Sequence, residues 1–174
     1  MKLLIFGATG SVGRQVVKQG LDQGHLITAF ARHPEKLGIQ HPNLQLFQGN
    51  VLDLGAVEQA MQGQDAVVCT LGAGKKLTGT VRSEGTRQII QAMEEIGVRR
   101  LICLSTLGTG DSWGNLNFYW KYVMFGFMLR LYKQGFTGTD NALTLEISRA
   151  DVADFSLKQL TSDAYLGKSP SLSY

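Results

Sequence analysis

The sequence predicts a single α/β domain in which a mainly parallel, doubly wound sheet is covered by helices on both faces. First, strand-like apolar runs alternate with helical patterns through the first two thirds of the chain. Second, a glycine-rich turn joins the first strand to the first helix. Third, a length of 174 residues, 44% of them hydrophobic and 18% charged, is typical of one soluble globular domain. Right-handed crossovers between such strands place helices on both sides of the sheet.

The elements follow in order from these patterns. Apolar residues at helical spacing, at Val12, Val16, Val17 and Leu21, predict the first helix. Asp53 is the expected N-cap of a helix over 54–62, which Gly63 ends. Ser83 is the expected N-cap of a further helix that Gly97 ends. The expected strands are 2–6, 26–31, 44–47, 66–71 and 101–105.

The first strand runs directly into Gly7-Ala8-Thr9-Gly10-Ser11-Val12-Gly13. Gly7 permits a sharp turn off the strand, Gly10 leaves room for a phosphate near the backbone, and Gly13 permits close packing of helix on strand. The first N–H groups of the helix have no partner within it, and the helix dipole adds positive charge there. The strand before the motif and the helix after it supply the context that the motif requires. The sequence therefore predicts a dinucleotide site.

The alternation stops in the last third of the chain. A sheet of this kind is expected to gain a sixth parallel strand after the fifth strand and its helix. After Arg130, the next apolar run is the short segment 143–147, and residues 148–151 then begin a last helix that runs to Leu160. A helix end and one strand are missing from the pattern, which is about thirty residues of a β-α-β unit.

The G-x-x-G-x-x-G spacing resembles that of the atypical, or extended, short-chain dehydrogenases/reductases. Residues 63–68 (GQDAVV) and 83–87 (SEGTR) are similar to the small NADPH-dependent reductases of the biliverdin-IXβ reductase/flavin reductase type, with NmrA-like NADPH-binding proteins as more distant relatives. The resemblance covers 1–108 and 131 to the C-terminus. It implies a Rossmann-type fold.

In that family a helix and an extended strand lie between the two resembling blocks, whereas here Leu131 follows Arg130 directly. We predict that Arg130/Leu131 is not a native peptide connection. A segment omitted from the sequence is the favoured explanation, and a true deletion is the alternative.

The end of the second strand indicates which dinucleotide is bound. A site for NAD carries Asp or Glu near this point, but the chain has Arg32, followed by His33 and Lys36, and Arg14 opens the first helix. Guanidinium groups suit phosphate recognition, so NADP(H) is the predicted cofactor. The residues predicted to bind it are Gly7, Thr9, Gly10, Ser11, Val12, Gly13, Arg32, Lys36, Asn50, Val51, Leu71, Gly72 and Ala73. Asn50-Val51 is expected on the adenine side and Leu71-Gly72-Ala73 on the nicotinamide side.

The chemistry is expected to differ from that of ordinary alcohol dehydrogenases. Their Tyr-x-x-x-Lys pair is absent, because Val123, Gly126 and Phe136 stand four residues after the tyrosines at 119, 122 and 132. Ser105 and Thr106, at the end of the fifth strand, are the candidate catalytic residues. By resemblance, Thr106 takes the position of a serine hydroxyl near the substrate. The alternative is that both hydroxyls only satisfy backbone groups at a strand end.

A planar conjugated acceptor of the flavin, tetrapyrrole or quinone class fits a site without a strong protein acid. The aromatic-rich segment 113–128 could cover such a ligand or simply pack in the core. A non-catalytic NADPH sensor of the NmrA-like kind, acting through a protein partner, is the alternative. The short C-terminal part argues against that sensor, and also against a sugar-nucleotide epimerase.

Charge and composition limit the other partners. The net charge is +3 and the basic residues are scattered, so no nucleic-acid partner is expected. The apolar stretch 118–132 is too short to span a bilayer and contains Lys121 and Arg130, so no membrane partner is expected. The sequence has no residue spacing typical of metal ligands, so no metal site is expected. A homodimer is compatible with the sequence.

The cysteines bear on the compartment. Cys69 and Cys103 lie in strand-like runs and are expected to be buried, reduced and without an activating neighbour. With no leader before the first strand, a cytoplasmic location is expected.

Overall fold

The computed structural model describes residues 1–72, 80–105, 147–168, 170 and 172. The chain divides into two compact units, Met1–Leu104 with Arg149–Leu160, and Ser105–Ser148 with Thr161–Tyr174. All the helices and strands given below lie in the first unit. The expectation of one domain over the whole chain stays a prediction.

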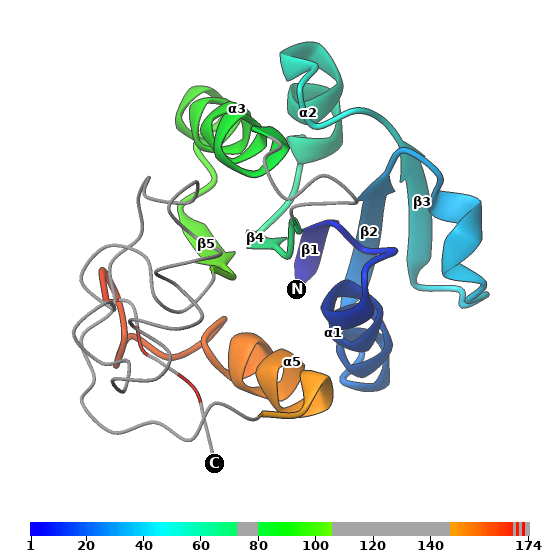
Figure 1. Ribbon diagram of the computed structural model, residues 1–174, viewed down its shortest axis with the longest axis vertical. Helices are drawn as coiled ribbons and strands as arrows, with labels where there is room; N and C mark the ends of the chain where they lie inside the picture. The colour runs from blue at the N-terminus through cyan, green and yellow to red at the C-terminus, as the bar shows by residue number, and fades with distance from the viewer. Residues whose placement is uncertain (73–79, 106–146, 169, 171, 173–174) are drawn as a thin grey trace, which may run out of the picture. The chain divides into compact units, whose positions relative to one another are not determined.

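The first unit is built on a sheet of five parallel strands (Figure 1). The strands are β1 (Lys2–Phe6), β2 (Leu26–Ala31), β3 (Leu44–Gln48), β4 (Ala66–Cys69) and β5 (Arg100–Cys103). Their order in the sheet is β3-β2-β1-β4-β5, with every neighbouring pair parallel. The chain thus adds strands on one side of β1 and then reverses to the other, which confirms the predicted doubly wound α/β fold.

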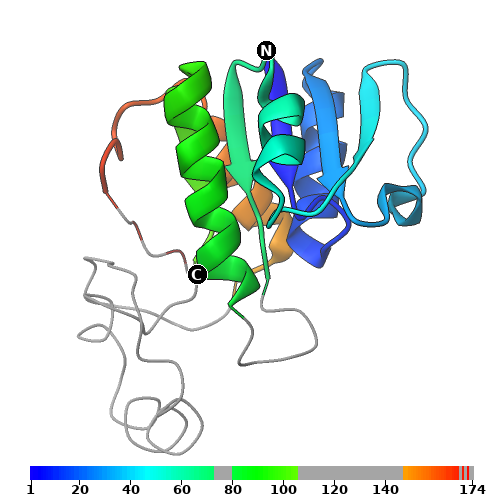
Figure 2. The ribbon, with the colours of Figure 1, turned by 90° about the horizontal axis from the view of Figure 1, so that it is seen from above.

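Helices cover both faces of this sheet, as the second view shows (Figure 2). One face carries α1 (Ser11–Asp22) and α5 (Arg149–Lys158), and the other carries α2 (Leu54–Met61) and α3 (Val81–Ile96). Strand side chains alternate between the two cores, so that Leu3 and Ile5 pack under α1 while Leu4 and Phe6 face α2 and α3. Burial on both faces explains why the strands are almost uniformly apolar.

The ends of the helices can be compared with the capping residues predicted from the sequence. The Asp53 carboxylate accepts a hydrogen bond from the Ala56 N–H at 3.3 Å, which confirms it as the N-cap of α2. Gly97 ends α3 with a φ of 87°, also as predicted. Ser83 was wrongly assigned as a cap, because α3 begins earlier, after Thr80. The Ser83 hydroxyl instead donates back to the Thr80 carbonyl at 3.0 Å, a competing local bond that serine readily makes.

The strands β4 and β5 end before their predicted ends at 71 and 105. Their last in-register partners are Cys69 and Cys103. Beyond them the Leu104 N–H bonds the Cys69 carbonyl at 2.9 Å, and the Thr70 N–H bonds the Phe6 carbonyl of β1 at 2.9 Å. Residues 70–72 therefore leave the sheet as a loop at its carboxyl edge.

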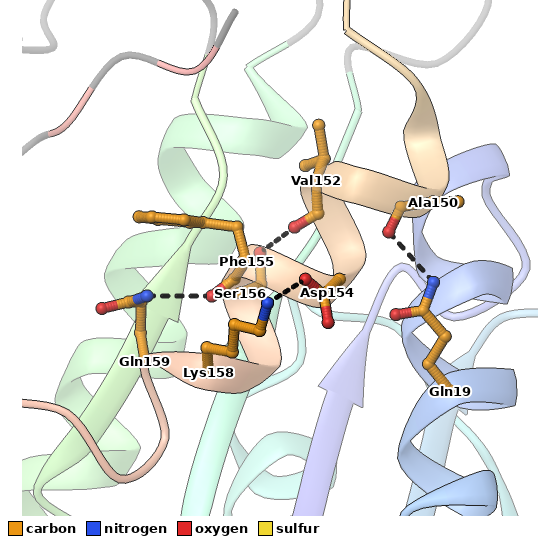
Figure 3. Close-up of polar contacts among 8 residues, drawn as sticks. All are labelled: Gln19, Ala150, Val152, Asp154, Phe155, Ser156, Lys158 and Gln159. Atoms are coloured by element: carbon orange, nitrogen blue, oxygen red, sulfur yellow. Dashed lines mark hydrogen bonds and ion pairs between the residues drawn. The ribbon is translucent and has the colours of Figure 1, made fainter.

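Helix α5 returns to the sheet from the C-terminal part of the sequence and lies beside α1 (Figure 3). The Gln19 side-chain amide of α1 donates to the Ala150 carbonyl at 3.0 Å. Within α5, Lys158 pairs with Asp154 at 2.7 Å. The predicted last helix is thus confirmed to within two residues at its C-terminus. The junction Arg130/Leu131 and most of the run 143–147 lie outside the described residues.

Candidate dinucleotide-binding site

The candidate site lies at the carboxyl ends of β1 and β4, where the order in which the chain adds strands to the sheet reverses. These two strands are neighbours, yet the crossovers that follow them run to opposite sides. In parallel sheets this arrangement leaves a crevice outside the strand ends, where ligands bind. The glycine turn 7–13 follows β1, and residues 70–72 follow β4, so both segments meet at this edge.

Gly7 and Gly13 of the turn have the roles that the sequence predicted for them. Gly7 has a φ of +76°, and a Cβ on it would lie 2.7 Å from the Thr70 carbonyl oxygen. A Cβ on Gly13 would lie 2.2 Å from the Gly7 carbonyl oxygen, which is inside any tolerable contact. Both positions therefore require glycine, and close packing of α1 on the strand end depends on it.

Gly10 forms the N-cap of α1 and leaves the helix end open to an anion. Its N–H bonds the Gly7 carbonyl at 2.9 Å, and no side chain caps the helix. The first turn, which begins with the exposed Ser11 and the half-buried Val12, contains no acidic residue. The N–H groups of this turn have no partner within the helix, so they can meet a phosphate without displacing a carboxylate.

Thr70 is a site residue that sequence reasoning missed. Its N–H and its hydroxyl both donate to the Phe6 carbonyl, at 2.9 and 2.8 Å. Its hydroxyl oxygen would lie only 2.9 Å from a Cβ on Gly7 and 2.8 Å from a Cβ on Gly13. Thr70 thereby fixes the glycine turn against the end of β4. A small hydroxyl residue directly after a fully apolar strand was the signal available, but it was counted as part of that strand.

The loop after β2 carries the basic residues. Arg32 and Lys36 are exposed. Among the described residues, neither side chain forms a hydrogen bond or an ion pair, and only their backbone carbonyls accept hydrogen bonds. His33 lies 3.4 Å from the Glu35 carboxylate. The loop continues as the short 3-10 helix η1 (Pro34–Leu37), whose Pro34 and Leu37 are buried. Arg32 and Lys36 thus remain available for a phosphate beside the second strand.

Arg14 has a different role from the one its position suggested. Its guanidinium donates to the carbonyls of Thr9 at 3.2 Å and Leu37 at 2.9 Å, and also to that of Lys36. These bonds tie the glycine turn to η1. Arg14 therefore positions the loop that carries Arg32 and Lys36, with a donor from each of its three nitrogens bonded to the backbone.

The residues that follow β3 form another part of the candidate site. Val51 is buried and packs against α3 at Gly85, where a Cβ would lie 2.7 Å from Val51 and 3.2 Å from Leu71. The exposed Asn50 accepts the Leu52 N–H through its side-chain oxygen at 3.2 Å. Asn50, Val51 and Leu71 are thus brought to one edge, with Gly72 exposed beyond them.

The remaining predicted site residues are less well placed. Ser105 is exposed directly after β5 and belongs to the second unit. Ala73 and Thr106 lie outside the described residues. Among the residues that are described, no group of three His, Cys, Asp or Glu could hold a metal ion. In the same part of the chain, every helix is too short or too polar to cross a membrane.

The cysteines correct the sequence analysis. Cys69 is buried as expected, but Cys103 is exposed. The pKa of Cys69 is lowered to about 7, chiefly by a hydrogen bond from Cys103, although burial opposes this. The expectation of no activating neighbour was wrong, because the neighbour lies on the adjacent strand rather than nearby in the sequence.

Comparison with known proteins agrees with this geometry. Residues 7–137 match the family described as NAD(P)H-binding. The photosystem II assembly factor Ycf39 of Synechocystis sp. is 29% identical over 115 residues, which are 64% of this chain and 35% of Ycf39. A (4-alkanoyl-5-oxo-2,5-dihydrofuran-3-yl)methyl phosphate reductase of Streptomyces griseus is 31% identical over 109 residues, which are 63% of this chain and 36% of the reductase. The matched region thus spans about a third of the length of these relatives.

Among solved structures, ChuY, an anaerobillin reductase from Escherichia coli O157:H7, shares the fold with a TM-score of 0.66. It is 22% identical, and the match covers 98% of this chain and 94% of ChuY. The family match spans most of this chain and begins at the glycine turn itself. The chain therefore belongs to the NAD(P)H-binding family of Rossmann-type, oxidoreductase-like proteins.

Proposed function

We propose that the protein is an NADPH-dependent reductase of a flat, conjugated acceptor of the flavin, linear tetrapyrrole or quinone class. The observation that carries the choice of cofactor is the free basic pair at the end of β2. Arg32 stands where a carboxylate would bond the ribose of NAD, and both Arg32 and Lys36 are exposed beside the crevice. Two cations there favour the extra phosphate of NADP(H) and offer no acceptor to a free ribose hydroxyl.

The described residues fit the rest of the dinucleotide. The open N-terminus of α1 at Gly10, Ser11 and Val12 would hold the pyrophosphate. Asn50 and Val51 would border the adenine, and Leu71 and Gly72 the nicotinamide side. When bound, the cofactor supplies the hydride.

The acceptor class follows from what the chain does not provide. The sequence has no Tyr-x-x-x-Lys pair to exchange a proton with an alcohol. A conjugated acceptor can take its proton from solvent, so the protein needs only to bind and orient both reactants. The proposed roles of Ser105 and Thr106 are to hydrogen-bond the acceptor. The names of the Streptomyces reductase and of ChuY are compatible with such a reduction.

The test is oxidation of NADPH and, separately, of NADH by the purified protein with FMN, FAD, biliverdin or a simple quinone. We expect turnover with one acceptor class and a preference for NADPH. Binding of NADPH without turnover of any acceptor would contradict the reductase and favour the NADPH sensor, which acts through a protein partner.

The cofactor preference is tested by Arg32→Ala. Loss of a charge-assisted contact is expected to raise the Kd for NADPH by about tenfold or more while leaving that for NADH nearly unchanged. Arg99→Ala is the matched control, because Arg99 is also exposed but precedes β5, at the opposite edge of the sheet. Equal losses for both dinucleotides in Arg32→Ala would refute its role.

A further inference from the structure

Cys69 and Cys103 are in-register partners at the end of the β4–β5 ladder. Neighbouring strands lie about 4.8 Å apart, and in-register residues of a parallel pair point to the same face. Their Cα atoms are therefore separated by a distance that a disulfide can span, about 4.4 to 6.8 Å. The sequence contains no other cysteine, so a disulfide within the chain can join only these two.

The surroundings favour one thiolate in this pair. The Thr86 hydroxyl oxygen of α3 lies 3.9 Å from the Cys69 sulfur, and the Leu71 N–H also bonds that sulfur. The charge of Arg82 acts in the same direction. Together with the Cys103 thiol, these groups lower the pKa of Cys69 to about 7. The neighbouring Cys69 side chain and burial both raise the pKa of Cys103. Near neutral pH part of the population therefore carries a thiolate at this pair.

Access to the pair is through Cys103. Cys69 is 1% exposed, whereas Cys103 is exposed on the edge-side strand β5. Reagents in solution therefore meet Cys103 first and react with the fraction of it that is deprotonated. A reagent in solution can thus react with Cys103 while Cys69 lies close enough to form a disulfide with it.

We propose that Cys69 and Cys103 form a redox-active dithiol that hydroperoxides oxidise to a disulfide joining β4 to β5. The Cys103 thiolate attacks the outer oxygen of the hydroperoxide, the O–O bond breaks, and an alcohol or water leaves with a proton. The resulting sulfenic acid is attacked by the Cys69 sulfur, the S–O bond breaks, and water leaves with the Cys69 proton. Two electrons pass from the thiols to the peroxide. A small dithiol such as dithiothreitol reverses the change.

Cys69 lies directly before the loop 70–72, but the inference does not depend on the proposed reductase. The oxidation uses only the two sulfurs and the hydroperoxide, and it can be followed without NADPH or an acceptor. Failure of the reductase assay would leave it intact, and its own failure would leave the reductase proposal intact.

The test is treatment of the purified, reduced protein with hydrogen peroxide, followed by thiol titration and intact mass. We expect both thiols to be lost together, the mass of the monomer to fall by two hydrogens, and dithiothreitol to restore both thiols. Peptide mapping should show Cys69 linked to Cys103. Addition of oxygen to Cys103 while Cys69 remains a free thiol would overturn the proposal.

Single variants and a second reagent separate a pair from two independent thiols. In Cys69→Ser, peroxide should leave a sulfenic acid on Cys103 that dimedone traps, whereas the native protein should yield little adduct. Phenylarsine oxide, which needs two adjacent thiols, should block both cysteines of the native protein at one arsenic per chain. This measurement needs no variant, so a folding defect in Cys69→Ser does not affect it. Retention of either free thiol with excess phenylarsine oxide would also overturn the pair.

Discussion

Gly13 illustrates how a single missing side chain determines the site. A Cβ there would lie 2.2 Å from the Gly7 carbonyl oxygen and 2.8 Å from the Thr70 hydroxyl oxygen. Because both neighbours are fixed, the first by the backbone turn and the second by its bond to Phe6, neither can move away cheaply. The cradle for the pyrophosphate and the packing of α1 on the sheet therefore depend on the same atom being absent.

Gly13→Ala is expected to lower the free energy of unfolding by about 2 kcal/mol or more and to weaken NADPH binding, because α1 must move off the strand end. Gly55→Ala is the matched control. A Cβ at Gly55 would meet only the Asp53 carboxylate at 3.6 Å, so this change should add about 0.5 to 1 kcal/mol of stability through helix propensity. Urea unfolding of both variants measures the difference. Equal stability of Gly13→Ala and the native protein would contradict the close packing.

Residues whose role depends on their sequence neighbours could be predicted, and those whose role depends on distant partners could not. Gly7 and Gly13 act between a strand and the helix directly after it, so their spacing sufficed. Arg14 was interpreted as a phosphate ligand because its partners at 36 and 37 lie on another element. The activation of Cys69 by Cys103 was missed for the same reason, since the two meet only through the register of β4 and β5.

At the level of elements, Arg14 joins α1 to η1 and thereby holds the loop that carries Arg32. Arg14→Ala removes a group that donates to three carbonyls, and it is expected to cost about 2 kcal/mol of stability. It should also weaken NADPH binding more than NADH binding, because the phosphate-binding loop loses its support.

Arg14→Lys should fail to restore either property, since one ammonium cannot reproduce the planar fork of a guanidinium. Calorimetric titration of the two dinucleotides, with urea unfolding alongside, measures both effects. Full rescue by lysine would show that charge alone matters at position 14 and would remove the positioning role.

The start of α2 offers a cleaner test of local structure. Asp53→Ala removes the acceptor for the Ala56 N–H and should cost about 1 kcal/mol, whereas Asp53→Ser, which keeps an acceptor, should lose only a few tenths. Thermal unfolding of the two variants distinguishes them. A loss of the same size in Asp53→Ser would mean that the cap bond contributes little to the helix. The predicted cap at Ser83 failed where this one succeeded, because the Ser83 hydroxyl donates to a carbonyl instead of accepting an N–H.

At the scale of the first unit, the parallel, doubly wound sheet followed from the sequence because each crossover is local and its hand is fixed. The bounds of β1 and β2 match those predicted, since buried parallel strands are continuous apolar runs. The last third resisted the same reasoning. There the sequence offered an aromatic-rich segment at 113–128 and a short apolar run at 143–147, and neither alone sufficed for the helix and sixth strand expected between β5 and α5.

Helix α5 joins the C-terminal part of the sequence to the first core, and its packing is the last quantity to test. Leu157 is 3% exposed and packs in the core shared by α1 and the sheet, beside the close approach of Gly20 to Ile27. Leu157→Ala should cost about 3 kcal/mol through lost burial and the cavity left behind. Lys158→Ala, on the same helix, removes only an exposed ion pair with Asp154 and should cost less than about 0.5 kcal/mol.

Because α5 shares one core with β1 and β2, both variants should unfold in a single transition seen alike by circular dichroism and fluorescence. A separate early transition in Leu157→Ala would show that α5 docks on a sheet that is already stable without it.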